Sequence, residues 1–332
     1  MKLINVEEHY MSKNVSEKMK KIFSEQEGNV SLAVEDATPG AADLAEIRIP
    51  YMDDRKIDVQ VISHAGALPA TMEKKYAVPL CKELNDEMYE EMKKNPGRFY
   101  AFAHLPLSSP EDAAIELERC VKELGFVGTM LSSHYKDLPY DDEFYFPIFE
   151  KAQELDVPVY LHPGMVREDV VNAYYKGDWN PRTTYLLSGF GIGWHYDVGM
   201  QAVRMMTSGL FDRLPKLKII LGHWGELVSF FMYRLDEMID AGVNSGKKFS
   251  DYFKENIYVN PSGMLYPEQL RYCLETFGAD HILWGEDYPY RKKEDIRTFL
   301  EEFPLSDEER EKIAHGNAEQ LFHIGITPLK KF

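Results

Sequence analysis

Several histidines and carboxylates of this sequence follow short apolar segments, where side chains able to hold a metal ion could gather. Glu7 and His9 close the first segment, His162 closes the fifth and Asp287 follows the eighth. Alternate residues of a strand face the same side, so Glu7 and His9 project together while Glu8 points away. Two imidazoles and two carboxylates suit Zn²⁺ or Mn²⁺ better than Ca²⁺ or Cu⁺. We therefore predict a metal site made by Glu7, His9, His162 and Asp287.

Six of the ten histidines are expected on the same rim, namely His9, His64, His104, His134, His162 and His223. A single histidine at a strand end is usually structural, but six that converge favour a functional site. His104 and His134, together with Arg234, are the predicted substrate-binding residues.

The run Leu221–Glu226 follows the sixth apolar segment and leads into a predicted helix. Glu226, Phe230 and Arg234 recur there at a spacing of four, which predicts Glu226 and Arg234 on one helical face. We expect His223 to face the substrate and Glu226 to orient the His223 imidazole. Arg234 fits a structural ion pair equally well.

Motifs of other chemistries are missing from the sequence. There is no Gly-x-Ser-x-Gly elbow, no phosphate-binding Gly-x-x-x-x-Gly-Lys loop, and no Gly-x-Gly-x-x-Gly after the first apolar segment. No lysine lies on Val127–Leu131, where a two-metal barrel site would need a bridging lysine. We therefore expect a single ion.

The elements that must position these residues alternate between short apolar strands and amphipathic helices, as in a parallel α/β sheet. Eight strands are predicted, at Leu3–Glu7, Asp58–Ser63, Phe99–His104, Val127–Leu131, Val157–His162, Leu217–Gly222, Asn256–Asn260 and His281–Gly285. Eight such alternations favour a (β/α)₈ TIM barrel over an open sheet. We expect one domain over residues 1–332, with insertions at about 10–57 and 163–199 that shape the mouth.

Composition narrows the class further. The formal net charge is −17 at pH 7, which would repel a nucleic-acid backbone. Glu7 and Glu8 interrupt the apolar run that a secretory segment needs, and no apolar run approaches the roughly 18 residues of a membrane span. The three cysteines lack metal-ligand spacing. These features predict a cytoplasmic protein with reduced thiols and no nucleic-acid or membrane partner.

Taken together, the sequence resembles the metal-dependent decarboxylase branch of the amidohydrolase superfamily, especially the decarboxylases of hydroxylated benzoates such as γ-resorcylate. The likeness covers nearly the whole chain and rests on Val6–His9, Phe99–Ala103, Leu124–Gly128, Val157–Pro163, Ser208–Asp212, Ile219–Glu226 and Gly316–Ala318. The resemblance implies an amidohydrolase-type barrel whose metal is held by the four predicted ligands, with His223 and Glu226 in the pocket. The Glu-x-His form of the first motif is similar to these decarboxylases, whereas hydrolytic relatives tend to have His-x-His.

The resemblance also implies a carboxy-lyase that removes carbon dioxide from an ortho-hydroxybenzoate. Asp287 is the candidate proton donor, with His223 and Glu226 stabilising the phenolate side. The expected partners are a small aromatic carboxylate and further copies of the chain in a homodimer or homotetramer. Two rivals stay open: a mononuclear metal-dependent hydrolase of a lactone or amide with Asp287 as general base, and a non-catalytic metal-binding scaffold.

Overall fold

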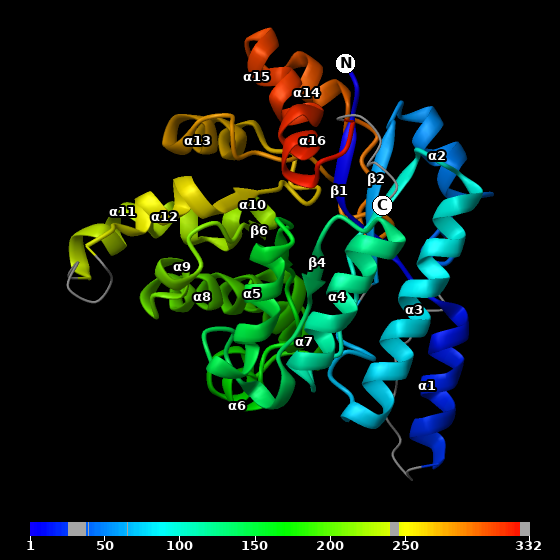
Figure 1. The fold of residues 1–332 in the computed structure, drawn as a ribbon. Coiled ribbons are helices and arrows are strands. Elements are labelled where there is room, and N and C mark those ends of the chain that lie inside the picture. Colours follow the sequence, from blue (N-terminus) through cyan, green and yellow to red (C-terminus); the bar gives the residue numbers. More distant parts are fainter. Residues whose placement is uncertain (26–37, 39, 65, 240–245, 326–332) are drawn as a thin grey trace.

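The computed structural model describes residues 1–25, 38, 40–64, 66–239 and 246–325. Within them, short parallel strands alternate with helices along the chain (Figure 1). The strands are β1 (Ile4–Tyr10), β2 (Val59–His64), β3 (Phe99–Ala101), β4 (Thr129–Leu131), β5 (Val159–Leu161), β6 (Ile219–Leu221) and β7 (Ile257–Val259).

The helices fall between and after these strands. They are α1 (Lys13–Glu25), α2 (Arg48–Asp54), α3 (Lys74–Lys94), α4 (Pro110–Leu124), α5 (Phe146–Glu154), α6 (Glu168–Val170), α7 (Pro181–Leu186), α8 (Gly193–Thr207), α9 (Leu210–Arg213), α10 (His223–Glu226), α11 (Val228–Met238), α12 (Phe249–Asn256), α13 (Pro267–Phe277), α14 (Thr298–Glu302), α15 (Asp307–Glu311) and α16 (Asn317–Phe322). The 3₁₀ helices are η1 (Tyr135–Asp137) and η2 (Glu143–Tyr145), and the π-helices are η3 (Val171–Tyr175), η4 (Leu187–Gly191) and η5 (Lys312–Gly316). Near the end of the described chain, α15, η5 and α16 follow one another directly.

The parallel strands close into a ring. β1, β2 and β3 form one sheet in that order, and β4 to β7 form another. Isolated parallel bridges join Ala103 to Thr129, Val259 to Ile282, and Trp284 to Asn5. These bridges connect the two sheets on one side and, through the extended segment 282–284, on the other. The predicted eighth strand is therefore this bridge-bonded segment, and the predicted α/β barrel is confirmed.

The barrel interior is filled by every second residue of the strands. Met130, Tyr160, Ile220 and Tyr258 are the central residues of their three-residue strands, and they pack together in one buried cluster with Ile4 and Val6. Their apolar neighbours along the strands, such as Leu131, Val159 and Ile219, pack into the separate cluster beneath the helices. This alternation is the pattern expected of a small barrel whose core is packed side chains. Leu321 and Phe322 of α16 join the interior cluster, so α16 covers the end where the strands begin.

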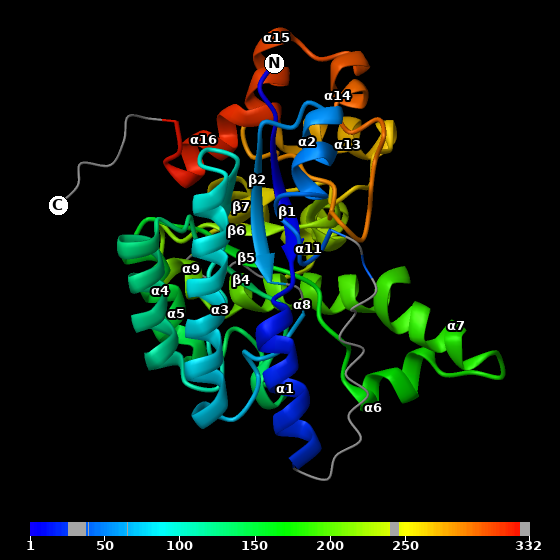
Figure 2. The same cartoon turned by 90° about the vertical axis from the view of Figure 1, so that its right-hand side faces the viewer.

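The two predicted insertions contain helices. The first, at about 10–57, holds α1 and α2, while its residues 26–37 and 39 lie outside the described part of the chain. The second, at about 163–199, holds α6, η3, α7 and η4 and the start of α8. Its residues 166–192, which we call the arm, project from the barrel in Figure 2. That residues 1–332 make one domain stays a prediction.

Two further features of the described residues bear on function. None of their helices combines the length and apolar character needed to cross a bilayer. A cavity of about 710 Å³ lies where the strands begin and is lined by residues that include Lys2, Val59 and Arg98. Lys2 and Arg98 are paired with Glu319 and Asp53, at 2.7 and 2.8 Å, so this cavity does not present them as free charges.

Candidate metal centre

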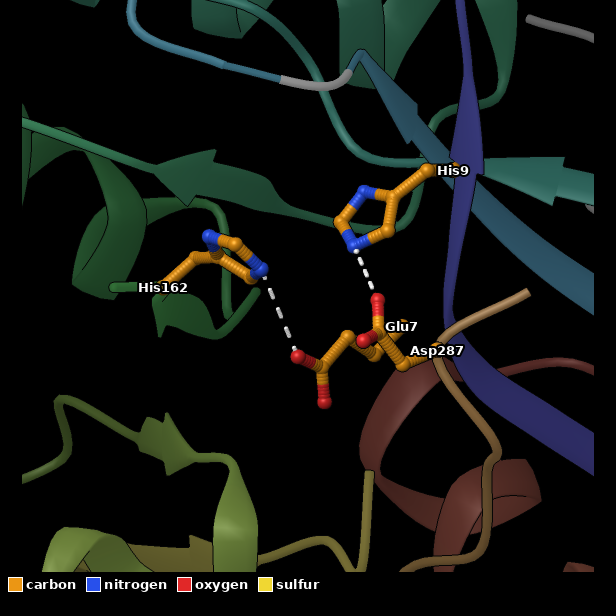
Figure 3. Close-up of side chains that lie close together, drawn as sticks. All are labelled: Glu7, His9, His162 and Asp287. Atoms are coloured by element: carbon orange, nitrogen blue, oxygen red, sulfur yellow. Dashed lines mark ion pairs between the residues drawn. The ribbon is translucent and has the colours of Figure 1, made fainter. Parts of the chain in front are cut away.

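The four predicted metal ligands meet at the end of the barrel where the strands finish (Figure 3). Each of Glu7, His9, His162 and Asp287 offers a ligand atom, and these atoms lie within 4.8 Å of one another. His9 Nε2 is 3.0 Å from an Asp287 carboxylate oxygen, and His162 Nε2 is 3.5 Å from Glu7 Oε1. Four residues that span 280 positions of sequence are brought together because parallel strands end on one rim.

The inward alternation of the strands explains the position of His162. Tyr160 points into the barrel interior, so His162, two residues later, projects from the same side at the mouth. Gly222 stands two residues after inward-facing Ile220. A Cβ at Gly222 would lie 2.8 Å from the Tyr160 hydroxyl and 3.1 Å from Glu7 Oε2. Glycine at this position therefore leaves room for the Glu7 carboxylate.

Glu7 stands on a bulge rather than in a regular strand. The pairing of β1 with β2 shifts register between Val6 and Glu8, and Glu7 has a φ of 77°. A positive φ is uncommon for glutamate and concentrates at functional sites. The expectation that Glu7 and His9 share a side while Glu8 points away is met, but through this bulge rather than through simple alternation.

The two oxygens of the fully buried Glu7 carboxylate differ in their hydrogen bonding within the described part of the chain. Oε2 accepts hydrogen bonds from the Tyr160 hydroxyl, the Ser262 hydroxyl and, at 2.8 Å, Asn260 Nδ2. Oε1 has no hydrogen-bond partner among the described residues. A buried carboxylate oxygen without a partner is costly, and a metal ion would satisfy it.

Both imidazoles also present one free nitrogen to the cluster. His162 Nδ1 lies 2.8 Å from the Pro163 carbonyl, which requires a proton on Nδ1 and leaves the Nε2 lone pair free. His9 Nδ1 lies 3.1 Å from the Ser63 hydroxyl, and buried His9 Nε2 makes no hydrogen bond within the described part of the chain. Burial lowers the pKa of His9 to about 4 and that of His162 to about 3, so both rings are neutral at pH 7. Neutral imidazole is the form that binds metals.

Glu8 positions the loop that carries Asp287. One Glu8 oxygen accepts the backbone N–H of Glu286 at 3.0 Å and the other accepts that of Tyr288 at 2.8 Å. The two bonds flank Asp287, whose φ is 65°. Burial raises the pKa of Asp287 to about 7. Glu8 thus holds an unusual backbone conformation from the opposite face of β1.

His223 and Glu226 form a charged pair beside the four ligands. His223 Nδ1 is 2.7 Å from Glu226 Oε1, and the His223 backbone N–H donates to Ser262, which itself touches Glu7. Burial would lower the pKa of His223, but the carboxylates, Glu226 first and then Glu7 and Asp287, together raise that pKa to about 9. Burial would raise the pKa of Glu226, but His223 and two hydrogen bonds lower it to about 2. The imidazole is therefore a cation at pH 7.

His104 and His134, two of the predicted substrate-binding residues, each pack against another ring, and their role in substrate binding stays a prediction. The His104 ring packs edge-on against His64, with centroids 4.9 Å apart. The His134 ring packs against Tyr140, and its Nε2 lies 3.8 Å from an Asp197 oxygen.

The prediction that Glu226 and Arg234 share a helical face is wrong. Leu227, with a φ of 69°, ends α10, and α11 begins a new direction at Val228. Glu226 is consequently buried, whereas the Arg234 side chain is 63% exposed and pairs with Glu237 at 3.5 Å. This ion pair matches the structural alternative for Arg234, and the predicted role of Arg234 in substrate binding stays a prediction.

Sequence reasoning missed four residues of the site: Tyr160, His195, Asn260 and Ser262. Tyr160 is an inward strand residue that reads as core, and Asn260 and Ser262 follow β7 in a polar run whose position after a strand was the available signal. His195 lies at the start of α8, within an insertion that has no strand register. No spacing rule points to it.

The family follows from comparison with known proteins. A family model described as amidohydrolase matches residues 27–324, so the chain belongs to the amidohydrolase family. The resemblance inferred from the sequence is confirmed by a γ-resorcylate decarboxylase of Polaromonas sp. (strain JS666), which is 37% identical over 295 residues and covers 85% of this chain and 88% of its own.

Solved structures of other proteins have the same fold as this chain. A structure described as a putative amidohydrolase from Staphylococcus aureus has a TM-score of 0.87 and 37% identity, covering 98% of this chain and 100% of its own. A dihydroxybenzoic acid decarboxylase from Polaromonas sp. JS666, with bound manganese and the inhibitor 2-nitroresorcinol, has a TM-score of 0.83 and 32% identity, covering 98% of each chain.

Proposed function

We propose that this protein is a metal-dependent carboxy-lyase that removes carbon dioxide from a hydroxylated aromatic acid without an oxidant. The observation that carries the proposal is the convergence of two neutral imidazoles and two carboxylates beside a cationic histidine. Supporting it, two relatives that are 37% and 32% identical, each over 85% of this chain, are γ-resorcylate decarboxylases. The substrate class is an ortho-hydroxybenzoate.

Glu7, His9, His162 and Asp287 would hold one divalent ion, because buried Glu7 Oε1 and His9 Nε2 make no hydrogen bond to any described residue and face other members of the group. When bound, the ion supplies positive charge that orients the substrate carboxylate and its neighbouring hydroxyl. Manganese is the first ion to test because a structural neighbour contains it; Zn²⁺ fits the same donor set.

The chain's own groups then move one proton. Asp287, whose carboxyl group lies beside His9 at the mouth of the barrel, protonates the ring carbon that bears the carboxylate. The carbon–carbon bond breaks, carbon dioxide leaves, and its electron pair restores the aromatic ring. The cationic His223 stabilises the phenolic oxygen during this step, and Glu226 keeps His223 charged.

The test is a product assay with the manganese-loaded protein on a panel of hydroxybenzoates in ¹⁸O-labelled water. Release of carbon dioxide with no ¹⁸O in the aromatic product is the expected result. No turnover of any hydroxybenzoate, together with ¹⁸O in the acid released from an aromatic lactone or amide offered in the same assay, would instead identify a hydrolase. Asp287→Asn should abolish turnover, while Asp280→Asn, which changes a surface carboxylate paired with Lys312, should not.

We also propose that the chain works as a homodimer or homotetramer. Supporting this, the arm and the adjoining start of α8 expose many large apolar side chains, among them Tyr174, Trp179, Tyr185, Leu186, Phe190, Ile192 and Tyr196. Exposed apolar surface of this extent is typical of protein interfaces. Light scattering on the eluted protein measures the mass directly, and a monomer at micromolar concentration contradicts the proposal.

A further inference from the structure

A second group of metal-type ligands lies beside the metal centre and consists of His195, His223 and Glu226, whose candidate donor atoms lie within 4.8 Å of one another. Its hydrogen bonds show a different use. Glu226 Oε1 is 2.7 Å from His223 Nδ1, and Glu226 Oε2 is 2.8 Å from His195 Nδ1. Each carboxylate oxygen thus already accepts from an imidazole, and the carboxylate bridges two histidines from different parts of the chain.

The protonation of His195 is fixed by its other neighbour. Trp194 Nε1, which can only donate, lies 2.9 Å from His195 Nε2, so Nε2 must be the accepting nitrogen. The Phe190 carbonyl is farther from Nε2, at 3.4 Å. The proton of the neutral ring therefore sits on Nδ1, where it is donated to Glu226.

The backbone around His195 is built for this approach. A Cβ on Gly193 would overlap the Ser188 carbonyl, and a Cβ on Gly199 would overlap the Glu226 carbonyl. Glycine at both positions lets η4 turn tightly into α8 and lets α8 lie directly on the turn that carries Glu226. The His195 and His223 rings are consequently in contact, with centroids 4.1 Å apart.

We propose that His195 is a positioning residue for the reaction: by donating Nδ1–H to Glu226 it fixes the carboxylate that orients the cationic His223, and Trp194 fixes the tautomer of His195. The insertion that carries the arm thereby completes the active site. The kinetic part of this inference rests on the proposed decarboxylase function; the hydrogen-bond arrangement does not.

The arrangement is tested first by ¹⁵N NMR of protein labelled in histidine. We expect His195 as the Nδ1–H tautomer in the wild type and a mixture of tautomers in Trp194→Phe, which keeps the ring but removes the donor. His195→Leu should shift the His223 signals, and His195→Asn should return them toward the wild-type values, because the Asn amide can donate from the position of Nδ1. An Nε2–H tautomer, or His223 signals unchanged in His195→Leu, would overturn the proposal whether or not any substrate is found.

Kinetics then test the role. His195→Leu should lower kcat by about 10- to 100-fold, the usual effect of removing a partner that orients a site group, with KM little changed. His195→Asn should restore most of kcat, and His323→Leu, which changes an exposed histidine, should behave as wild type. Wild-type kcat in His195→Leu contradicts the inference and leaves the decarboxylase function standing. Manganese titration should give one ion per chain in all variants; a second ion lost in His195→Leu would show that the cluster is a metal site.

Discussion

Replacing Glu7 by Gln tests the metal centre most sharply, because the structure dictates how the new side chain must sit. Three donors, the hydroxyls of Tyr160 and Ser262 and the amide of Asn260, converge on the oxygen Oε2. An amide nitrogen cannot accept from them, so the Gln carbonyl oxygen must take that position. The NH₂ group then faces the ion with hydrogens where Glu7 Oε1 offers a charged lone pair.

The expected result is a folded protein that binds manganese at least about 100-fold more weakly, a loss of about 2.8 kcal/mol at about 1.4 kcal/mol per factor of ten. This is a lower bound, since losing a residue that only orients a ligand already costs about 10- to 100-fold. Calorimetric titration of the metal-free protein measures the affinity, and circular dichroism checks the fold. Glu17→Gln, on the exposed face of α1, is the matched control. Wild-type manganese affinity in Glu7→Gln would refute the assignment of the site.

Three further predictions follow from the same geometry. The charged pair of His223 and Glu226 makes the stability of the metal-free protein depend on pH in both the alkaline and the acidic range. The raised pKa of His223 contributes stability that is full below pH 6.5 and is lost as pH rises through about 9. The lowered pKa of Glu226 contributes stability that is full above pH 4.5 and is lost as pH falls through about 2. Thermal unfolding across pH should show both losses, and a His223→Gln protein should lack the alkaline one. Tyr160→Phe removes a buried donor to a carboxylate and should destabilise the fold by about 1.5 to 3 kcal/mol in urea unfolding; an unchanged midpoint would show that this hydrogen bond contributes nothing. Arg234→Ala removes only an exposed ion pair with Glu237, so it should change the free energy of unfolding by less than about 0.5 kcal/mol and leave kcat and KM unchanged. A tenfold rise in KM would instead support the predicted role of Arg234 in substrate binding.

The residues that sequence analysis placed correctly are those governed by strand alternation. His162 follows an inward tyrosine by two positions, and Asp287 follows the last apolar segment, so both were bound to reach the mouth of a parallel barrel. The barrel itself was predictable for the same reason, since eight buried apolar segments separated by amphipathic stretches have few other ways to pack.

The residues that it missed or misplaced depend on local backbone geometry. Among the missed residues Ser262 has a positive φ of 49°, and the helix break that was not predicted lies at Leu227, with a φ of 69°. Such conformations are fixed by tertiary contacts rather than by local preference, so no periodicity announces them. The break at Leu227 separated Arg234 from Glu226 for this reason, and the tight turn before α8 delivered His195 from an insertion that no register rule covers.

The barrel closes between β1 and the extended segment 282–284, and metal ligands lie on both sides of this junction. The first strand and the segment near the end of the chain are joined through Val6 N–H to the Trp284 carbonyl at 2.7 Å and His9 N–H to the Tyr288 carbonyl at 2.6 Å. Glu7 and His9 come from one edge and Asp287 from the other. A metal ion bound between them therefore links the two edges of this junction. Every tenfold excess of free ion over its Kd stabilises the closed barrel by about 1.4 kcal/mol. Binding of the metal ion and closure of the barrel are therefore thermodynamically linked in this protein.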